Sequence, residues 1–383
     1  MSRKSIVAAA ILGPLCLLAL PGAAPAAQDL VTLTSSFFPD RPWGPISAAD
    51  GALAGAGRAT DPGSSWSLNP ATMAKAGMWR VRATALAVDP QRNDLRASTL
   101  DYSDTSPFVS LGETGIHATR GQLQFALYLA QDSYQQSKEQ YIKDEPGFGP
   151  LSFETQTETH RARYGLSAGA TRGAWSGGLA IEGNHVSERF EFQPSQDAQN
   201  LGAVPGKANL KGNAVGGAAG VSWQASPLVL VGADAHFAGT PRLKDESGND
   251  VGSDEIPASF DLGATVGKET GGHLLVGASH QGARDVELGD SLGRGTDHDP
   301  ARWNFAAGYH YKPAEAKWDF RAGFGWSPFP GEGAPRYSRM GAGLGYDFDG
   351  VLVHLAYSRD ARHSSDDTNT SRNWFTLGFD LKL

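Results

Sequence analysis

Charged side chains recur at every second position in several segments of this sequence, as in Arg80 and Arg82 and again in Asp319 and Arg321. Alternate residues of a β-strand point to the same face, so these charges are expected to line one face of a sheet. Two kinds of chemistry fit them: a network of ion pairs that braces the protein, which the mixed signs favour, or an arginine that binds a ligand carboxylate with its planar fork. The complete set on this face is Arg80, Arg82, Arg161, Arg163, Glu182, Asp234, His236, Asp261, Asp319, Arg321, Arg339, Asp347 and His354.

Two of these arginines and four aromatic residues near the N-terminus are the candidate ligand contacts. Pockets for small molecules are lined mainly by apolar and aromatic side chains, with a few placed polar groups. Packing of the N-terminal segment on itself explains the four aromatic residues equally well. The candidates are Arg163, Arg321, Phe37, Phe38, Trp43 and Trp66.

Other chemistry has little support in the sequence. The acidic clusters at 245–255 and 297–299 lack the ligand spacing of a calcium loop, and Gly341-Ala342-Gly343 has no following helix, unlike a nucleotide loop. No Gly-x-Ser-x-Gly elbow is present. We therefore expect no metal ion, no cofactor and no enzymatic activity; a serine and histidine pair on the outer wall of a barrel, as a phospholipase needs, is a distant alternative.

Composition and the N-terminus indicate an exported protein. The net charge of −8 argues against nucleic acid, whose binders carry a basic surface. Arg3 and Lys4, the apolar run 6–20 and the small residues 24–26 have the order of a secretory signal peptide, expected over 1–27. The one cysteine, Cys16, falls in that segment, so no disulfide is expected in the mature chain.

From Met78 onward the chain alternates apolar with polar or small residues in segments of about 10 to 14 residues. In 256–267, for example, Phe260 and Leu262 fall on one face and Asp261 on the other. These segments are longer than the strands of soluble sheets and match strands that cross a bilayer. They predict an all-β fold, an antiparallel transmembrane barrel of about fourteen strands at 78–88, 107–117, 120–132, 157–170, 174–187, 207–223, 228–240, 256–268, 272–285, 301–312, 316–327, 336–347, 351–362 and 372–383.

Connection lengths give the orientation of this barrel. Short turns at 171–173, 225–227, 269–271, 312–315 and 349–350 alternate with long links at 133–156, 188–206, 241–255, 286–300, 328–335 and 363–371. Short turns of such barrels face the periplasm and long loops face outside. Both chain ends then lie on the periplasmic side, from which the preceding segment can enter the barrel.

The segment 28–77 has neither helical nor strand periodicity and carries the glycine-rich stretch 55–74. Irregular backbone at membrane depth is tolerated only inside protein or beside a cavity, so we expect 28–77 to be a hatch inside the barrel formed by 78–383. Asn69 precedes Pro70, which favours an extended or turn conformation, and its amide is expected to tie the hatch to the wall. An ordinary turn is the alternative.

The chain resembles the FadL-like family of outer-membrane transporters for long-chain fatty acids and other hydrophobic compounds. Three regions carry the likeness. The run from Gly57-Arg58-Ala59 to Asn69-Pro70-Ala71 is similar to the family's hatch motif. Ile256-Pro257-Ala258-Ser259 with Leu262-Gly263 is similar to its mid-barrel strand, and Ala307-Gly308-Tyr309, Phe320-Arg321-Ala322-Gly323-Phe324 and Pro328 are similar to its paired later strands.

The resemblance implies a monomeric fourteen-stranded barrel in the outer membrane of a Gram-negative bacterium. Its hatch residues would be Gly57, Asn69, Pro70 and Ala71. A hydrophobic ligand of the fatty-acid kind would be caught between outer loops, enter the barrel and leave sideways through a gap beside an inward kink of the third strand, near 120–132. Two departures are the polar links 188–206 and 241–255 and the final Leu383, where such barrels commonly end in Phe.

Passive uptake of hydrophobic small molecules through a hatch-gated barrel is the function that these patterns favour. The partners expected are the outer-membrane lipid bilayer and the ligand, with no nucleic acid. Two alternatives keep the same fold: a scaffold for secretion or surface attachment that transports nothing, for which the polar outer loops speak, and a general porin, which a filled lumen would contradict.

Overall fold

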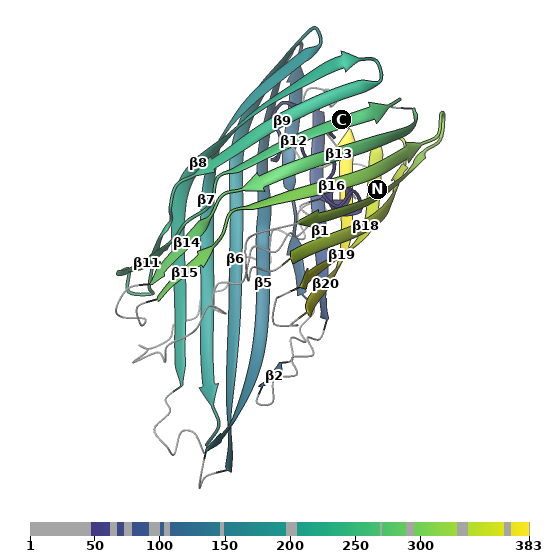
Figure 1. The fold of residues 1–383 in the computed structure, drawn as a ribbon. Helices are drawn as coiled ribbons and strands as arrows, with labels where there is room; N and C mark the ends of the chain where they lie inside the picture. The colour runs from purple at the N-terminus through teal and green to yellow at the C-terminus, as the bar shows by residue number, and fades with distance from the viewer. Residues whose placement is uncertain are drawn as a thin grey trace, which may run out of the picture.

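The computed structural model describes residues 47–61, 67–72, 79–91, 100–102, 108–145, 149–196, 205–268, 270–288, 295–327, 336–363 and 369–382. Their strands form one antiparallel sheet that closes on itself, because the first strand, β1 (Trp79–Gln91), pairs with the last, β20 (Asn369–Lys382). The result is a barrel of fourteen wall strands, as predicted, and several of these strands are broken into two or three pieces (Figure 1).

Four neighbouring strands are much longer than the rest: β5 (Leu123–Glu145), β6 (Gly149–Arg172), β7 (Trp175–Pro194) and β8 (Gly206–Ser226). No helix in the described part of the chain is long and apolar enough to cross a membrane. The remaining strands are β2 (Leu100–Tyr102), β3 (Phe108–Leu111), β4 (Thr114–Arg120), β9 (Val229–Ala238), β10 (Arg242–Lys244), β11 (Asp250–Asp254), β12 (Ser259–Gly267), β13 (Gly271–Gln281), β14 (Arg284–Leu288), β15 (Gly295–Asp299), β16 (Arg302–Lys312), β17 (Trp318–Ser327), β18 (Arg336–Asp347) and β19 (Val351–His363).

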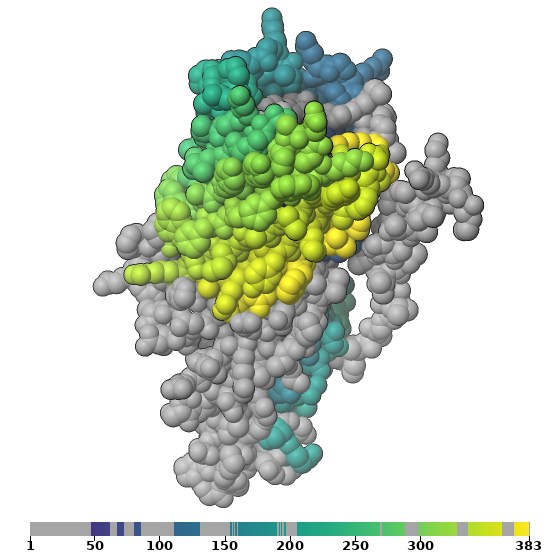
Figure 2. Space-filling model, turned by 90° about the vertical axis from the view of Figure 1, so that its right-hand side faces the viewer, coloured from purple at the N-terminus to yellow at the C-terminus, as the bar shows by residue number. Residues whose placement is uncertain are grey.

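The two faces of the wall differ as the alternation predicts. On β12, Phe260 and Leu262 are 38% and 42% exposed on the outside, whereas Asp261 between them is buried inside. Aromatic side chains gather toward both ends of the outer face, where Trp175 stacks on Trp223 at one end and Phe305 packs on Trp326 at the other. Figure 2 shows this outer face over the C-terminal strands, coloured green to yellow. An apolar outer band flanked by aromatic residues is the surface of a barrel that spans an outer membrane.

The predicted long link at 133–156 is wrong for most of its length. β5 and β6 continue as a paired hairpin from Leu123↔Ala170 to Glu145↔Gly149. This stretch is rich in Gln, Glu and Ser, so it lacks the apolar face on which the prediction relied, yet its Tyr and Phe residues still favour a strand. A strand of about 9 to 11 residues crosses a bilayer, so the 23 and 24 residues of β5 and β6 project well beyond it (Figure 1).

Four other predicted features are corrected by the structure. The link 241–255 contains the hairpin of β10 and β11, and β14 and β15 occupy much of 286–300. The link 188–206 is shortened because β7 continues to Pro194. The second predicted strand, 107–117, is two pieces, β3 and β4, because Gly112 and Glu113 interrupt it.

Candidate functional site

Residues 47–61 and 67–72 lie inside the barrel and form the hatch in the described part of the chain. The hatch begins with a short helix, α2 (Ala48–Ala52), whose N-cap Ser47 accepts a hydrogen bond from the Asp50 backbone N–H at 3.1 Å. Every residue of α2 is buried against the wall strands β17 to β20. Small side chains let the helix approach the wall closely, since Ala48 and Ala52 pack directly on Ala356 of β19.

Asn69 joins the two described pieces of the hatch to each other and to the wall. Its Nδ2 donates to the carbonyl oxygen of Ala59 at 2.9 Å and to that of Ala233, on β9, at 3.4 Å. Its Oδ1 accepts from the backbone N–H of Ala71 at 2.8 Å. The side chain is fully buried, and its hydrogen bonds with Ala59 and Ala71 are made away from water.

The other hatch residues named by the sequence lie in the same lumen. The carbonyl oxygen of Gly57 accepts from the backbone N–H of Asp61 at 2.7 Å and closes a turn within the hatch. Ala71 is buried. Pro70 presents its carbonyl oxygen to Gly169 and Gly178 of the wall.

The wall receives the hatch on glycines that pair directly across neighbouring strands. A Cβ at any of these glycines would lie within about 3.2 Å of a hatch atom or overlap it, because hatch residues 51–59 and 69–70 touch the strands here. We call these nine residues the glycine seat. It consists of three rows, Gly169–Gly178–Gly220, Gly232–Gly263–Gly277 and Gly308–Gly323–Gly341.

Charged wall residues hold the second piece of the hatch. The backbone N–H of Ser67 donates to Glu113 at 2.8 Å, and Nη1 of Arg163 donates to the carbonyl oxygen of Ser67 at 3.1 Å. His236 Nε2 lies 2.5 Å from the carbonyl oxygen of Leu68. Glu113 and Arg163 therefore bind the backbone of one hatch residue, Ser67, at its N–H and at its carbonyl oxygen.

The same charges are paired within the wall. Arg82 bridges Glu113 at 3.0 Å and Asp380 at 2.8 Å. Arg163 pairs with Glu182 at 3.2 Å, and Glu182 also accepts from the hydroxyl of Tyr128 at 2.5 Å. A charge in an apolar interior is costly unless it is paired and hydrogen-bonded. Because these wall charges are paired with one another, the hatch can fill the lumen beside them.

Arg321, the second candidate arginine, lies on β17, far round the wall from Arg163 on β6. Its Nε lies 3.4 Å from Oδ1 of Asp319, and its Nη1 lies 3.4 Å from Nδ1 of His354. Asp319 also meets His310 at 3.3 Å, and His310 meets His273 at 3.1 Å. The structure thus places Arg163 and Arg321 in separate networks. Phe37, Phe38, Trp43 and Trp66 lie outside the described residues.

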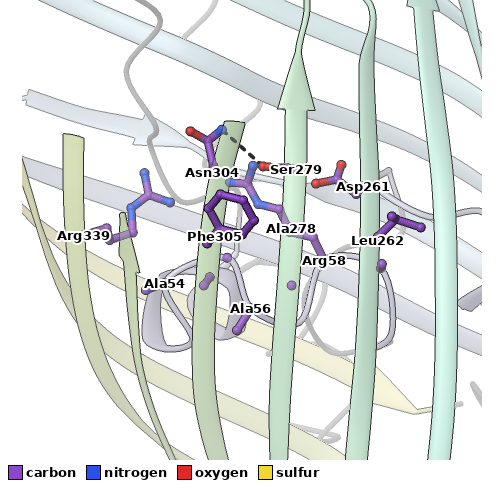
Figure 3. A pocket seen from close by; sticks show the side chains of 14 residues that line it. Ala54, Ala56, Arg58, Asp261, Leu262, Ala278, Ser279, Asn304, Phe305 and Arg339 are labelled. Atoms are coloured by element: carbon purple, nitrogen blue, oxygen red, sulfur yellow. Dashed lines mark hydrogen bonds between the residues drawn. The ribbon is translucent and has the colours of Figure 1, made fainter. Parts of the chain in front are cut away.

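A small cavity separates the hatch from the wall strands β12, β13, β16 and β18. In Figure 3 the Arg58 side chain rises from the hatch toward Asn304 and Ser279, with Asp261 on the neighbouring strand. The cavity measures about 20 Å³, which is room for about one water molecule. An organic ligand cannot occupy it while the hatch is seated as described.

Among the described residues, the hydrogen-bonded ladder along β5 is interrupted beside the hatch. β4 pairs with β5 only between Leu123 and Leu129, and β2 pairs with β5 only from Glu139 to Tyr141. Between these ladders the described part of β3 pairs with β1 and not with β5. β5 is the third wall strand, and its register on β6 shifts at Gln131, inside the range in which the resemblance implies a kink.

Sequence reasoning missed Glu113, which lies at the edge of this interruption. It is fully buried and points to the hatch. Its signal in the sequence is faint: Gly112-Glu113 interrupts the alternation of the second predicted strand. The hatch reaches the opposite edge as well, because Leu68 packs on Ala130 of β5.

Comparisons with known proteins agree on the architecture. No family model and no curated protein matches the sequence. Among solved structures, the CymD monoaromatic hydrocarbon channel superposes with a TM-score of 0.62 at 13% identity, over 88% of this chain and 97% of that one. The Ralstonia pickettii toluene transporter TbuX gives 0.61 at 14% identity, and a Pseudomonas aeruginosa FadL homologue gives 0.58 at 15%, each over 88% of this chain and 98% of the other.

The fold is therefore that of a hatch-filled outer-membrane barrel. More specifically, it is the FadL-type fold that the sequence resemblance implied. At these identities the likeness establishes the architecture alone.

Proposed function

We propose that this chain is a passive outer-membrane channel for hydrophobic small molecules, gated by the hatch. The CymD monoaromatic hydrocarbon channel and the toluene transporter TbuX share its fold, and long-chain fatty acids are a second ligand class to test. In this proposal residues 1–27 are a signal peptide, 28–77 the hatch and 78–383 a monomeric barrel. Phe37, Phe38, Trp43 and Trp66 remain candidate ligand contacts.

The observation that carries the proposal is the contact between the hatch and the interrupted wall. Ser67 and Leu68 of the hatch touch Glu113 and Ala130, one at each edge of the interruption. A shift of this one hatch segment would therefore join the lumen to the interruption. The described part of β3 pairs with β1 and forms no ladder with β5, so opening the wall there breaks no β3–β5 ladder.

Physical chemistry favours a sideways exit. Toward the short-turn end the lumen wall carries His273, His310, Asp319 and Arg321, and an apolar molecule that passes these groups gains nothing from burial. Transfer of apolar surface from water into a hydrocarbon environment is favourable. A ligand at the interruption thus has a downhill route into the bilayer.

A reversible disulfide across the interruption tests this route. Cysteines at Leu111 and Asp132 would face each other if the register of β4 on β5 continued across the interruption. The control pair, Ala118→Cys with Phe125→Cys, joins residues that already pair in the intact ladder. Uptake of toluene and of a long-chain fatty acid is measured in cells with each pair oxidised and then reduced.

In the variant with cysteines at Leu111 and Asp132, we expect oxidation to block uptake and reduction to restore it. In the control variant, oxidation and reduction should leave uptake unchanged. Unchanged uptake with a fully formed disulfide across the interruption would reject the sideways route. Absence of uptake by the unmodified protein would reject transport and favour the scaffold alternative. Free passage of small sugars by the unmodified protein would favour a general porin.

A further inference from the structure

Two lysines lie directly opposite each other on the outer wall, near the long-loop end of the barrel. Lys211 of β8 is the register partner of Lys244 of β10, and both side chains are exposed. Like charges directly opposite each other in a sheet destabilise it. In the described part of the chain this is the only ladder position at which β8 and β10 pair, so the repulsion falls on their one ladder pair.

A third cation, Arg242, lies two positions before Lys244 on the same face of β10. The two side chains are 80% and 57% exposed, and both approach only Asp250: its Oδ2 lies 3.7 Å from Arg242 Nη1, and its Oδ1 lies 3.9 Å from Lys244 Nζ. Exposed ion pairs of this kind are weak. Among the described residues, no carboxylate lies within ion-pair distance of Lys211. We call Lys211, Arg242 and Lys244 the basic patch; its three cations share one carboxylate.

The carboxylates of the neighbouring hairpin turn are engaged elsewhere. Asp245 accepts hydrogen bonds from the side chain and the backbone N–H of Asn249, and Glu246 accepts from the side-chain amide of Asn209. Within the described residues neither carboxylate lies within ion-pair distance of the basic patch. The patch therefore keeps an excess of positive charge, although the whole chain has a net charge of −8.

The basic patch lies just beyond the lipid-facing band. On the outer face of β8, Val215 is 75% exposed and forms one row with Gly183 and Tyr164; an aromatic residue is typical of the edge of the band. Lys211 lies four residues further, roughly 13 Å along the strand, and strand tilt shortens this distance across the membrane. Headgroups begin at this level, and a lysine side chain can bend back toward them.

The headgroup chemistry of the outer leaflet matches the patch. In a Gram-negative outer membrane this leaflet consists of lipopolysaccharide, whose lipid A anchor carries phosphate groups and several acyl chains. A phosphate group carries a charge of about −1.5 to −2 near pH 7 and offers strong acceptor oxygens, and clusters of Lys and Arg bind such headgroups. A phosphate between Lys211 and Lys244 replaces one repulsion with two attractions, and the acyl chains then lie against the exposed apolar band below.

We propose that the basic patch binds a lipid A phosphate, so that one lipopolysaccharide molecule docks on the outer wall across β8 and β10. The bound phosphate would join the two strands at their one described ladder pair. The site lies outside the barrel, away from the hatch and the lumen. It requires the outer-membrane location and is independent of the proposed transport.

The test measures lipid binding to the purified full-length barrel by native mass spectrometry in a non-ionic detergent. The probes are diphosphoryl lipid A, the same lipid A without its phosphates, and phosphatidylglycerol, with inorganic phosphate as a competitor. The variants are the double changes Lys211→Gln with Lys244→Gln and Lys211→Arg with Lys244→Arg. The matched control, Lys312→Gln with Lys317→Gln, removes two exposed lysines at the short-turn end. Heat-modifiable migration in gels shows that each variant is folded.

We expect diphosphoryl lipid A to bind at least about tenfold more tightly than the form without phosphates, as one charge-assisted hydrogen bond supplies. The double glutamine variant at Lys211 and Lys244 should lose this preference, because both ammonium groups are gone. The double arginine variant should keep most of it, and the control at Lys312 and Lys317 should keep all of it.

Three results would overturn the proposal. The first is a preference for diphosphoryl lipid A that survives in the double glutamine variant at Lys211 and Lys244. The second is phosphatidylglycerol that binds as tightly as diphosphoryl lipid A, which would mean a general affinity for anionic lipids. The third is inorganic phosphate that displaces lipid A at an equal concentration, which would mean a site for free phosphate alone.

Discussion

The side-chain amide of Asn69 donates to the carbonyl oxygen of Ala59 at 2.9 Å, ten residues earlier in the hatch. Through this bond the two described pieces of the hatch become one body. The second donor hydrogen of the same amide reaches Ala233 of the wall at 3.4 Å. One buried side chain thus sets both the shape of the hatch and its place in the barrel.

Replacing Asn69 should loosen the hatch. Asn69→Ala leaves the carbonyl oxygens of Ala59 and Ala233 and the N–H of Ala71 without their partner, and each buried unsatisfied group costs roughly 1 to 3 kcal/mol. We expect a leak to small hydrophilic solutes, measured as single-channel current in planar bilayers. Asn69→Asp keeps the acceptor for Ala71 but loses both donors, so it should leak nearly as much. An Asn69→Ala variant that shows no more current than the unmodified protein would contradict this role.

A methyl group in the glycine seat should displace the hatch. At Gly220 a Cβ would overlap Oδ1 of Asn69, and overpacking of this kind typically costs about 1 to 3 kcal/mol. Gly177→Ala is the matched control, because a Cβ there meets only one backbone atom, at 3.9 Å. Labelling of a cysteine introduced at Thr72 should be faster in Gly220→Ala than in the parent and unchanged in Gly177→Ala; equal rates in all three would rule out the seat.

The outer band should behave as a lipid-facing surface. Ile181 is 71% exposed on β7, and an arginine facing the bilayer middle costs about 2 to 4 kcal/mol in such barrels. We expect Ile181→Arg to lower the free energy of unfolding in vesicles by that amount, measured by denaturant titration. The same change at Glu191, on the projecting part of β7, should have little effect. A tolerant Ile181 would mean that this face is not in contact with lipid.

The hairpin of β10 and β11 should lose order in acid. The side chain of Asn249 and the backbone N–H groups of Asn249 and Ser247 donate to Asp245; the Asn249 side chain is the main cause of the lowered pKa of that carboxyl. A lowered pKa means that the stabilisation is complete above the ordinary value of about 3.9 and disappears as the pH falls through the lower folded value. An NMR titration of Asp245 in nanodiscs measures this midpoint; a midpoint at or above the ordinary value would contradict the turn.

The sequence predicts the barrel well because lipid imposes a rule on each residue. Leu262 must face hydrocarbon and Asp261 must not, so alternation along β12 reveals both faces without knowledge of any partner. The Asn69-Pro70 pair marks the hatch for a similar reason, since irregular backbone at membrane depth needs an enclosed place. Where apolar and polar residues do not alternate in the sequence, as over 133–156 in β5 and β6, the rule gives no signal and a strand is taken for a loop.

Site residues are harder to predict because their roles depend on partners far away in the chain. Arg163 and Arg302 look alike in sequence, and only the fold shows that one meets Glu182 while the other meets Gln281 and Tyr337. Glu113 is similar: its contact with Ser67 spans 46 positions. No local pattern records such distances.

The glycine seat also constrains the order of assembly. Its three rows run from β6 to β18, whereas the hatch precedes β1 in the chain, so the hatch leaves the ribosome before any part of its resting place exists. The rows are complete only when β18 has joined β17, and the β1–β20 seam cannot form until the last strand is delivered. Hatch docking must therefore be a late step in biogenesis, and a truncation before β18 would leave the hatch exposed to periplasmic proteases.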